Sequence, residues 1–129
     1  IILNFNRLRL IKWFYFSNLT SLRILRMKNN RISSIEKNSF QDLINLQELD
    51  LENNCLFGLD PVLFLNMNRL SLLNLGNNVL KDLKASWFNY LQSLRQIFLN
   101  NNQIGKLNIK IFSNLKNLGT LDLSRTRLI

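Results

Sequence analysis

Three carboxylates alternate along one short stretch of the chain, at Glu48, Asp50 and Glu52. Two basic residues with the same alternation, Arg26 and Lys28, stand 24 positions before the last two of them. Alternate residues of a β-strand point to the same side of the sheet. Adjacent strands would therefore place the two basic side chains within reach of Asp50 and Glu52. Such an arrangement is a lateral charge match between strands, a charged hot spot for a basic or mixed partner or, least in keeping with parallel carboxylates, a calcium site.

Apolar side chains are expected on the same face, which should otherwise contact water. They are Ile2, Ile24, Leu72 and Phe98. An exposed aromatic ring at the centre of such a surface suits an interface anchor, and Phe98 is the candidate. Single exposed apolar residues are also ordinary on protein surfaces. The candidate ligand-binding residues of this face are Arg26, Lys28, Glu48, Asp50, Glu52, Leu72, Gln96 and Phe98.

The sequence offers little for catalysis. Histidine, the commonest catalytic base and metal ligand, is absent. The single cysteine, Cys55, cannot form an internal disulfide, and we expect a buried structural thiol there rather than a reactive one. We find no glycine loop suited to phosphate, no metal-ligand spacing and no catalytic pair of side chains. The chain is therefore not expected to be an enzyme or to hold a metal or cofactor.

The elements that would position these residues recur every 24 residues. Between Leu46 and Leu56 the chain reads L-x-x-L-x-L-x-x-N-x-L, and this skeleton returns almost unchanged along the sequence. An asparagine column consists of Asn6, Asn30, Asn54, Asn78 and Asn102, and Thr126 breaks it. A phenylalanine column consists of Phe16, Phe40, Phe64, Phe88 and Phe112, and a strand column of Ile1, Leu25, Leu49, Leu73, Ile97 and Leu121.

Each repeat predicts one turn of a coil. The alternating leucines form a strand with one buried face, and successive strands stack in parallel about 4.8 Å apart. The phenylalanines are expected to stack along the opposite, convex side. No convex segment has a clear helical period, so residues 12–15, 36–39 and 60–63 are expected to be irregular or short 3₁₀ connections. The predicted fold is an α/β solenoid, a horseshoe with a parallel concave β-sheet.

The asparagine column has a structural role in this prediction. The chain bends after each strand, and the bend leaves inward-facing backbone groups without partners. A buried side-chain amide has donors and acceptors for the backbone of its own and neighbouring turns. The residues beside the column include Asn29, Asn53, Asn77 and Asn101. For these we consider both adaptable hydrogen bonding to a ligand and ordinary turn chemistry.

Residues 1–129 are interpreted as a single domain of about five repeats, four complete and the others truncated at the two ends. Solenoids need capping elements over their terminal turns, and none is visible at Ile1 or Ile129. We therefore interpret the chain as an excerpt from a longer protein. No apolar run approaches the roughly 18 residues that a membrane span needs, and no signal peptide is recognisable.

The 24-residue period with its phenylalanine column resembles the typical class of leucine-rich repeats, over essentially all 129 residues. This form is similar to that of extracellular proteins: Toll-like receptor ectodomains, small proteoglycans, Slit-like guidance proteins, lamprey variable lymphocyte receptors and insect immune proteins. The resemblance implies a recognition scaffold at the cell surface or outside the cell. The cysteine-rich caps of such ectodomains are missing here, so no disulfide supports that location.

Our first functional hypothesis is a protein-recognition module, part of a receptor ectodomain or of a secreted immune or adhesion protein. It would bind a protein ligand through its concave face, and the parent protein could be a homo- or heterodimer. Asn18 begins an Asn-Leu-Thr sequon in a loop that we expect to be exposed. Glycosylation at Asn18 and a chance occurrence of the triplet are equal alternatives.

The charge distribution supports a second hypothesis. The net charge is +9, and the residues up to Lys37 carry eight basic side chains against one acid, Glu36. Nucleic acid or another polyanion would bind this basic part. The contributing residues, in which we recognise no obvious stripe, are Arg7, Arg9, Lys12, Arg23 and Arg31. The charge can also serve solubility alone, and a third hypothesis is a purely structural spacer.

Overall fold

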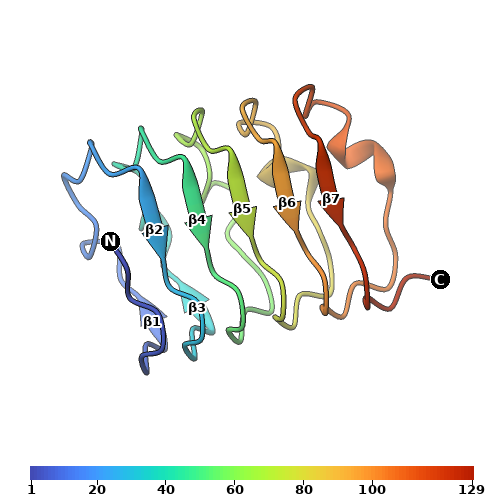
Figure 1. Ribbon diagram of the computed structural model, residues 1–129, viewed down its shortest axis with the longest axis horizontal. Helices are drawn as coiled ribbons and strands as arrows, with labels where there is room; N and C mark the ends of the chain where they lie inside the picture. Colours follow the sequence, from blue (N-terminus) through green and yellow to red (C-terminus); the bar gives the residue numbers. More distant parts are fainter.

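The computed structural model describes all residues from 1 to 129 and forms a solenoid of parallel strands (Figure 1). The principal sheet contains, in this order, β2 (Ile24–Arg26), β4 (Glu48–Asp50), β5 (Leu72–Asn74), β6 (Gln96–Phe98) and β7 (Thr120–Asp122). Each strand pairs in parallel with the residues 24 positions further along, as Leu49 does with Leu73. The sequence period is therefore one turn of the coil, and the predicted solenoid is confirmed.

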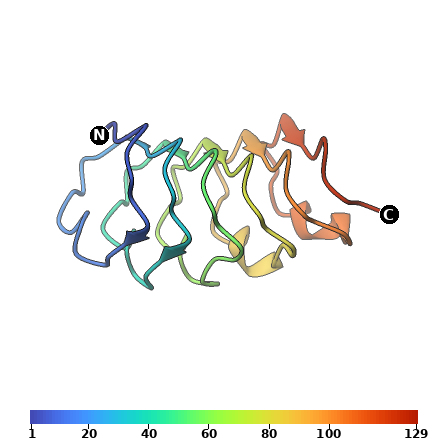
Figure 2. The same cartoon turned by 90° about the horizontal axis from the view of Figure 1, so that it is seen from below.

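The side of the coil opposite the principal sheet consists mainly of turns, with two short 3₁₀ helices in the later turns (Figure 2). The helices are η1 (Ala85–Trp87) and η2 (Ile109–Phe112). Residues 12–15, 36–39 and 60–63 form mainly turns, in agreement with the irregular connections expected there, and the 3₁₀ helices occur only later in the chain. The Asn108 side chain accepts a hydrogen bond from the backbone N–H of Lys110 at 3.1 Å, which caps the start of η2.

A second, two-stranded parallel sheet joins β1 (Leu10–Ile11) to β3 (Ser34–Ile35). The sequence pattern did not predict this sheet, because a two-residue strand leaves almost no periodicity. The pairing does not continue into the third turn, where Gly58 takes the place of Leu10 and Ser34. Glycine weakens strands, since it has no side chain to pack on the sheet.

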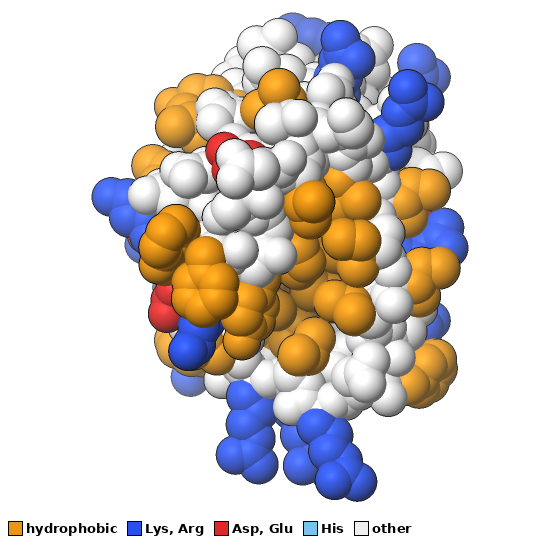
Figure 3. Space-filling view, turned by 90° about the vertical axis from the view of Figure 1, so that its left-hand side faces the viewer, with side chains coloured by type: hydrophobic (Ala, Val, Ile, Leu, Met, Phe, Trp, Pro, Cys, Tyr) orange, Lys and Arg blue, Asp and Glu red, His pale blue; other side chains and the backbone are white.

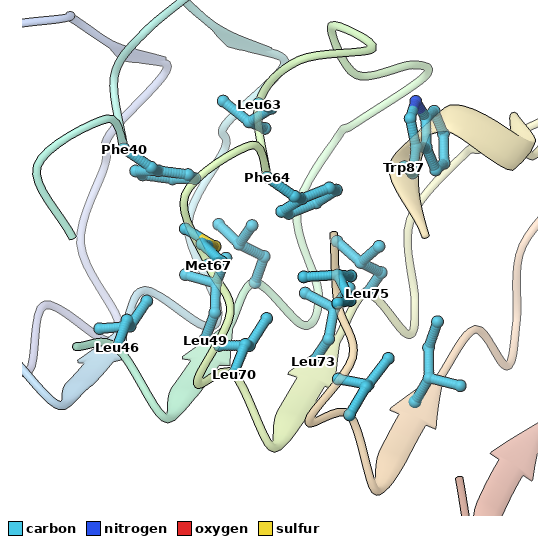
Figure 4. Packing of buried hydrophobic residues seen from close by; sticks show 14 of the residues in the cluster. Phe40, Leu46, Leu49, Leu63, Phe64, Met67, Leu70, Leu73, Leu75 and Trp87 are labelled. Carbon is cyan, nitrogen blue, oxygen red and sulfur yellow. The ribbon is translucent and has the colours of Figure 1, made fainter. Parts of the chain in front are cut away.

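The core lies between the two sides and consists of the column side chains. The strand column from Leu25 to Ile97 is wholly buried, and the phenylalanine column is at most 8% exposed. In Figure 4, Phe40 and Phe64 lie in successive turns on the far side of the strand leucines. The ring centroids are 6.0 Å apart between Phe16 and Phe40 and 5.0 Å apart between Phe88 and Phe112. The predicted alignment of the columns is therefore confirmed.

The asparagine column forms a ladder of hydrogen bonds inside the coil. The side-chain amide of Asn78 donates to two carbonyls of its own turn, on Leu75 and Gly76, each at 3.1 Å. It donates also to the carbonyl of Leu51 in the preceding turn at 3.0 Å. The Asn78 carbonyl oxygen accepts from the backbone N–H of Leu56 at 3.0 Å. One side chain thus satisfies the backbone of two consecutive turns.

The same bonds recur at three other ladder positions, Asn30, Asn54 and Asn102, all of them buried. Asn6 differs from the prediction, because its side chain is exposed. It bonds only to carbonyls of its own turn, on Leu3 and Asn4. A buried ladder side chain bonds also to the backbone of the turn before its own. Residues 1–129 contain no turn before that of Asn6 with which it could bond in this way.

A left-handed backbone accompanies each bend, at the residue before every ladder position. These residues are Phe5, Asn29, Asn53, Asn77, Asn101 and Arg125, with φ between 53° and 59°. Asparagine tolerates this region better than most residues do, which accounts for its repetition here. Two of these side chains also donate to the equivalent side chain of the preceding turn, Asn53 to Asn29 and Asn101 to Asn77. Turn chemistry therefore explains these asparagines.

We predict that Asn78→Ala destabilises the chain by about 2 kcal/mol, because the buried N–H of Leu56 loses its acceptor. The matched control is Asn77→Gly, which removes the neighbouring amide but keeps the left-handed backbone. It should cost less than about 1 kcal/mol, since the Asn77 side chain is only partly buried. Urea unfolding measures both variants. Equal losses would show that the ladder assignment is wrong.

Candidate functional site

The strand face is our name for the surface formed by the outward side chains of the five-stranded sheet. In β4 and β5 the central residue is buried and its two neighbours point outward. None of the eight candidate binding residues is buried, and all lie on this face, either within the strands or two positions beyond them. They are Arg26, Lys28, Glu48, Asp50, Glu52, Leu72, Gln96 and Phe98.

Two ion pairs join β2 to β4 and the residues that follow them. The Arg26 guanidinium contacts Glu48 with two bonds, Nε to Oε1 at 2.6 Å and Nη2 to Oε2 at 3.1 Å. Lys28 Nζ lies 3.1 Å from Oε2 of Glu52, as predicted. Arg26 has Asp50 as its direct neighbour in the register, as predicted, but its ion pair is the diagonal one with Glu48. The hydrogen bond to Glu48 and the charge of Glu48 raise the pKa of Arg26.

The Asp50 carboxylate already bonds to the backbone of its own repeat, which explains why Arg26 pairs with Glu48. It accepts a hydrogen bond from the backbone N–H of Glu52 at 3.0 Å. Asn74 makes the equivalent bond in the next turn, to the N–H of Gly76 at 3.0 Å. Burial raises the pKa of Asp50, while the Glu52 N–H works in the opposite direction.

The three carboxylates on β4 and just beyond it therefore bond to different partners. Glu48 binds Arg26, Asp50 binds backbone, and Glu52 binds Lys28 and also accepts from the side chain of Asn77 at 3.1 Å. No group of three or more Asp, Glu or Cys side chains is arranged to hold a metal ion. The lateral charge match describes this half of the face better than a calcium site does.

The half of the strand face on β5 and β6 is apolar and rich in amides. Leu72 stands beside Gln96 and Asn74 beside Phe98, with Leu72 and Phe98 partly buried. Two residues beyond β5 lies Gly76, where a Cβ atom would meet Oδ1 of Asn100 at 2.6 Å and Oδ1 of Asn74 at 3.2 Å. The side chains of Asn74 and Asn100 thus close over the glycine. Sequence reasoning missed this contact, although the lone glycine in its column was a visible signal.

Other predicted positions lie away from the strand face. Asn18 is exposed, and its backbone N–H donates to Oδ2 of Asp42 at 2.8 Å. Cys55 is exposed, which contradicts the expected buried thiol. The reason is its place between Asn54 and Leu56, both of which point inward.

The basic residues show more order than the sequence analysis expected. Arg7 and Arg31 occupy the same position in adjacent turns, and the backbone N–H of Ser33 donates to the carbonyl of Arg9 at 3.0 Å. Arg7, Arg9 and Arg31 are all exposed and form a basic flank where the chain leaves the sheet. Figure 3 shows Lys and Arg side chains projecting from the lower edge of this end of the molecule. Arg7 and Arg31 therefore share a column that the sequence analysis did not recognise, while Arg9 lies in another.

Replacing Asp50 by asparagine is predicted to keep or raise the stability at pH 7. Asparagine retains the acceptor for the Glu52 N–H, as Asn74 shows, and removes a partly desolvated charge. Because the folded pKa is raised, the wild-type carboxyl binds its proton more tightly in the folded chain. Its contribution to stability is therefore largest at low pH and falls as the pH rises from the ordinary value of 3.8 through the raised value. Urea unfolding at several pH values measures this dependence. Over this pH range the free energy of unfolding should fall less with rising pH in Asp50→Asn than in the wild type, and the same pH dependence in both proteins would contradict this assignment.

Comparison with known proteins places the fold in context. The leucine-rich repeat family model matches residues 1–56, 44–104 and 68–128, which together cover nearly the whole chain. No curated protein sequence matches the chain. No helix of the structure is long and apolar enough to span a bilayer.

Three solved structures are similar in fold. A leucine-rich repeat protein from Leptospira interrogans is 26% identical, with a TM-score of 0.86 over 95% of this chain and 30% of that one. A chain of the LRIM1/APL1C complex is 24% identical, with a TM-score of 0.91 over 95% of this chain and 23% of that one. TLR13, in its complex with ssRNA13, is 29% identical, with a TM-score of 0.86 over 93% of this chain and 18% of that one.

The chain thus spans less than a third of the length of each of these proteins. The match of the family model along the sequence agrees with the parallel strands, the buried leucines and the asparagine ladder. This chain belongs to the leucine-rich repeat family.

Proposed function

We propose that the chain is a protein-recognition module that binds a protein ligand through the strand face. The observation that carries this proposal is the set of hydrogen bonds that hold side chains of the face in place within the chain itself. Two hydrogen bonds join Arg26 to Glu48, and one backbone N–H donates to Asp50. These bonds already hold three candidate side chains in place. Since ordering side chains costs free energy on binding, such preorganisation favours affinity.

The composition of the strand face suits a protein ligand with both polar and apolar groups. The half on β2 and β4 offers charges, with the Glu48 side chain 22% exposed and that of Arg26 38% exposed. The half on β5 and β6 offers Leu72 and Phe98 beside the amides of Asn74 and Asn100. Protein interfaces combine apolar anchors with a polar, partly wet rim in this way.

The proposal extends to a receptor ectodomain or a secreted immune or adhesion protein. It draws support from the similar folds of TLR13 and of a chain in the LRIM1/APL1C complex. The exposed Asn18 sequon fits an extracellular location. Mass spectrometry of the secreted chain would detect a glycan on Asn18, and an unmodified Asn18 would count against this location.

The strand-face proposal can be tested with peptides selected from a displayed random library on the wild-type chain. The variant Glu48→Gln/Asp50→Asn/Phe98→Ala should bind the selected peptides at least about tenfold more weakly, because it removes the charged anchor and the aromatic anchor together. The matched control, Asp82→Asn/Lys84→Gln/Ile109→Ala, changes exposed residues outside the strand face and should bind as the wild type does. Calorimetry measures the affinities, and equal binding by both variants would exclude the strand face as the site.

Polyanion binding is a second candidate, favoured by the unpaired basic residues. Of the 17 lysines and arginines, only Arg26 and Lys28 form ion pairs. The flank of Arg7, Arg9 and Arg31 could contact a single-stranded nucleic acid, and the similar protein TLR13 was solved with ssRNA13. Contact with three phosphates would give a slope of about −2 in log affinity against log salt concentration. Binding to a single-stranded oligonucleotide that does not respond to salt would reject this candidate.

A further inference from the structure

Three consecutive aromatic side chains are exposed on the first turn, on the side opposite the strand face. Trp13, Phe14 and Tyr15 are 54%, 52% and 45% exposed. Their rings contact one another edge to face, with centroids 5.7 Å apart for Trp13 and Phe14 and 5.3 Å for Phe14 and Tyr15. An aromatic cluster of this kind is unusual on a soluble surface without a partner.

The exposure of Trp13 follows from its position in the turn. Every residue at the equivalent position of the later turns is exposed as well: Lys37, Pro61, Ala85 and Ile109. The position of Tyr15 differs, because its equivalents Ser39, Leu63 and Trp87 are buried. Trp13 therefore projects from the coil because this position of the repeat points outward in every turn. The Phe14 ring lies against it. Tyr15 forms the edge of the cluster that reaches toward the core.

Two lysines and one carboxylate lie beside the cluster. Lys12 Nζ lies 5.9 Å from the centroid of the Phe14 ring. Lys37 is exposed one turn further along, at the position equivalent to Trp13. The carboxylate of Glu36 accepts a hydrogen bond from the backbone N–H of Trp13 at 3.0 Å. The cluster thus presents aromatic rings together with ammonium groups, and a matching surface would be apolar beneath and negatively charged at its boundary.

We propose that Trp13, Phe14 and Tyr15 insert into the interface of an anionic lipid bilayer, with Lys12 and Lys37 at the headgroups. Tryptophan and tyrosine favour this interface because each has an apolar body and a polar edge. Lysine can bury its aliphatic stem and keep its ammonium at the level of the headgroups. The rings stand at 84° and 90° to one another, so they offer no flat platform on which nucleic-acid bases could stack.

This lipid contact would be compatible with ligand binding at the strand face. The two surfaces lie on opposite sides of the coil, with the buried columns between them (Figure 2). A chain held at a bilayer by its convex side would direct the strand face away from the membrane. The proposal rests on the cluster alone, so its failure would leave the strand-face function untouched.

The chain carries its own fluorescent probe for a test. Of its two tryptophans, Trp87 is 1% exposed and Trp13 is 54% exposed, so changes in exposure report on Trp13. We expect vesicles of phosphatidylcholine mixed equally with phosphatidylserine to shift the emission to shorter wavelengths and to protect it from acrylamide. Phosphatidylcholine vesicles alone should have a much smaller effect, because the lysines then find no net negative charge.

Matched variants separate insertion from general electrostatic attraction. Lys12→Gln/Lys37→Gln should weaken binding to the mixed vesicles by roughly fivefold for each lysine removed. Lys84→Gln/Lys110→Gln removes the same charge from the same side of the coil, away from the cluster, and should change the affinity less. Phe14→Ser keeps the Trp13 probe and should reduce insertion, with urea unfolding confirming that each variant is folded.

Three results would overturn the proposal. They are the absence of any vesicle-induced shift in the wild type, equal losses from the two lysine pairs, and unchanged insertion of Phe14→Ser. Quenching of Trp13 by a single-stranded oligonucleotide without a response to vesicles would also overturn it, in favour of nucleic acid.

Discussion

The hydrogen bonds of the buried asparagines are the constraint on which the rest of the structure depends. After each strand the chain must turn away from the sheet, and the bend exposes backbone groups that the interior cannot hydrate. Asn54, Asn78 and Asn102 each bond to the backbone of their own turn and to that of the turn before. No turn is therefore complete by itself. The stability of such a coil lies in the contacts between neighbouring turns, as in other repeat proteins.

This constraint also determines where recognition residues can lie. With the register fixed at 24 residues, each position of the repeat points in the same direction in every turn. Residues between the inward leucines become an ordered outward surface, which is how Glu48 and Phe98 reach the same face from different strands. The same rule carries Trp13 outward on the opposite side. The spacing of residues in the sequence thus determines which side chains lie on the strand face and which lie on the opposite side. No further structural element is needed to position them.

The sequence pattern predicted the direction of side chains well and their partners less well. Periodicity placed the leucine, phenylalanine and asparagine columns, because burial of a whole column leaves a visible pattern. It could not decide that Arg26 binds Glu48, since either carboxylate is within reach and the outcome depends on the backbone N–H that already holds Asp50. The exposure of Cys55 was predictable from its neighbours Asn54 and Leu56. The two-residue strands β1 and β3 were not, because so short a pairing has no period.

The most direct measurement of the ladder is amide hydrogen exchange at three residues of the chain in its native state. The backbone N–H groups of Ile32, Leu56 and Leu80 donate only to ladder side chains, at 2.9–3.0 Å. If the ladder joins the turns, these amides exchange as slowly as those of Met27, Leu51 and Leu75, which bond between strands. Exchange as fast as at the exposed turn residue Lys37 would mean that the asparagines do not hold the bends.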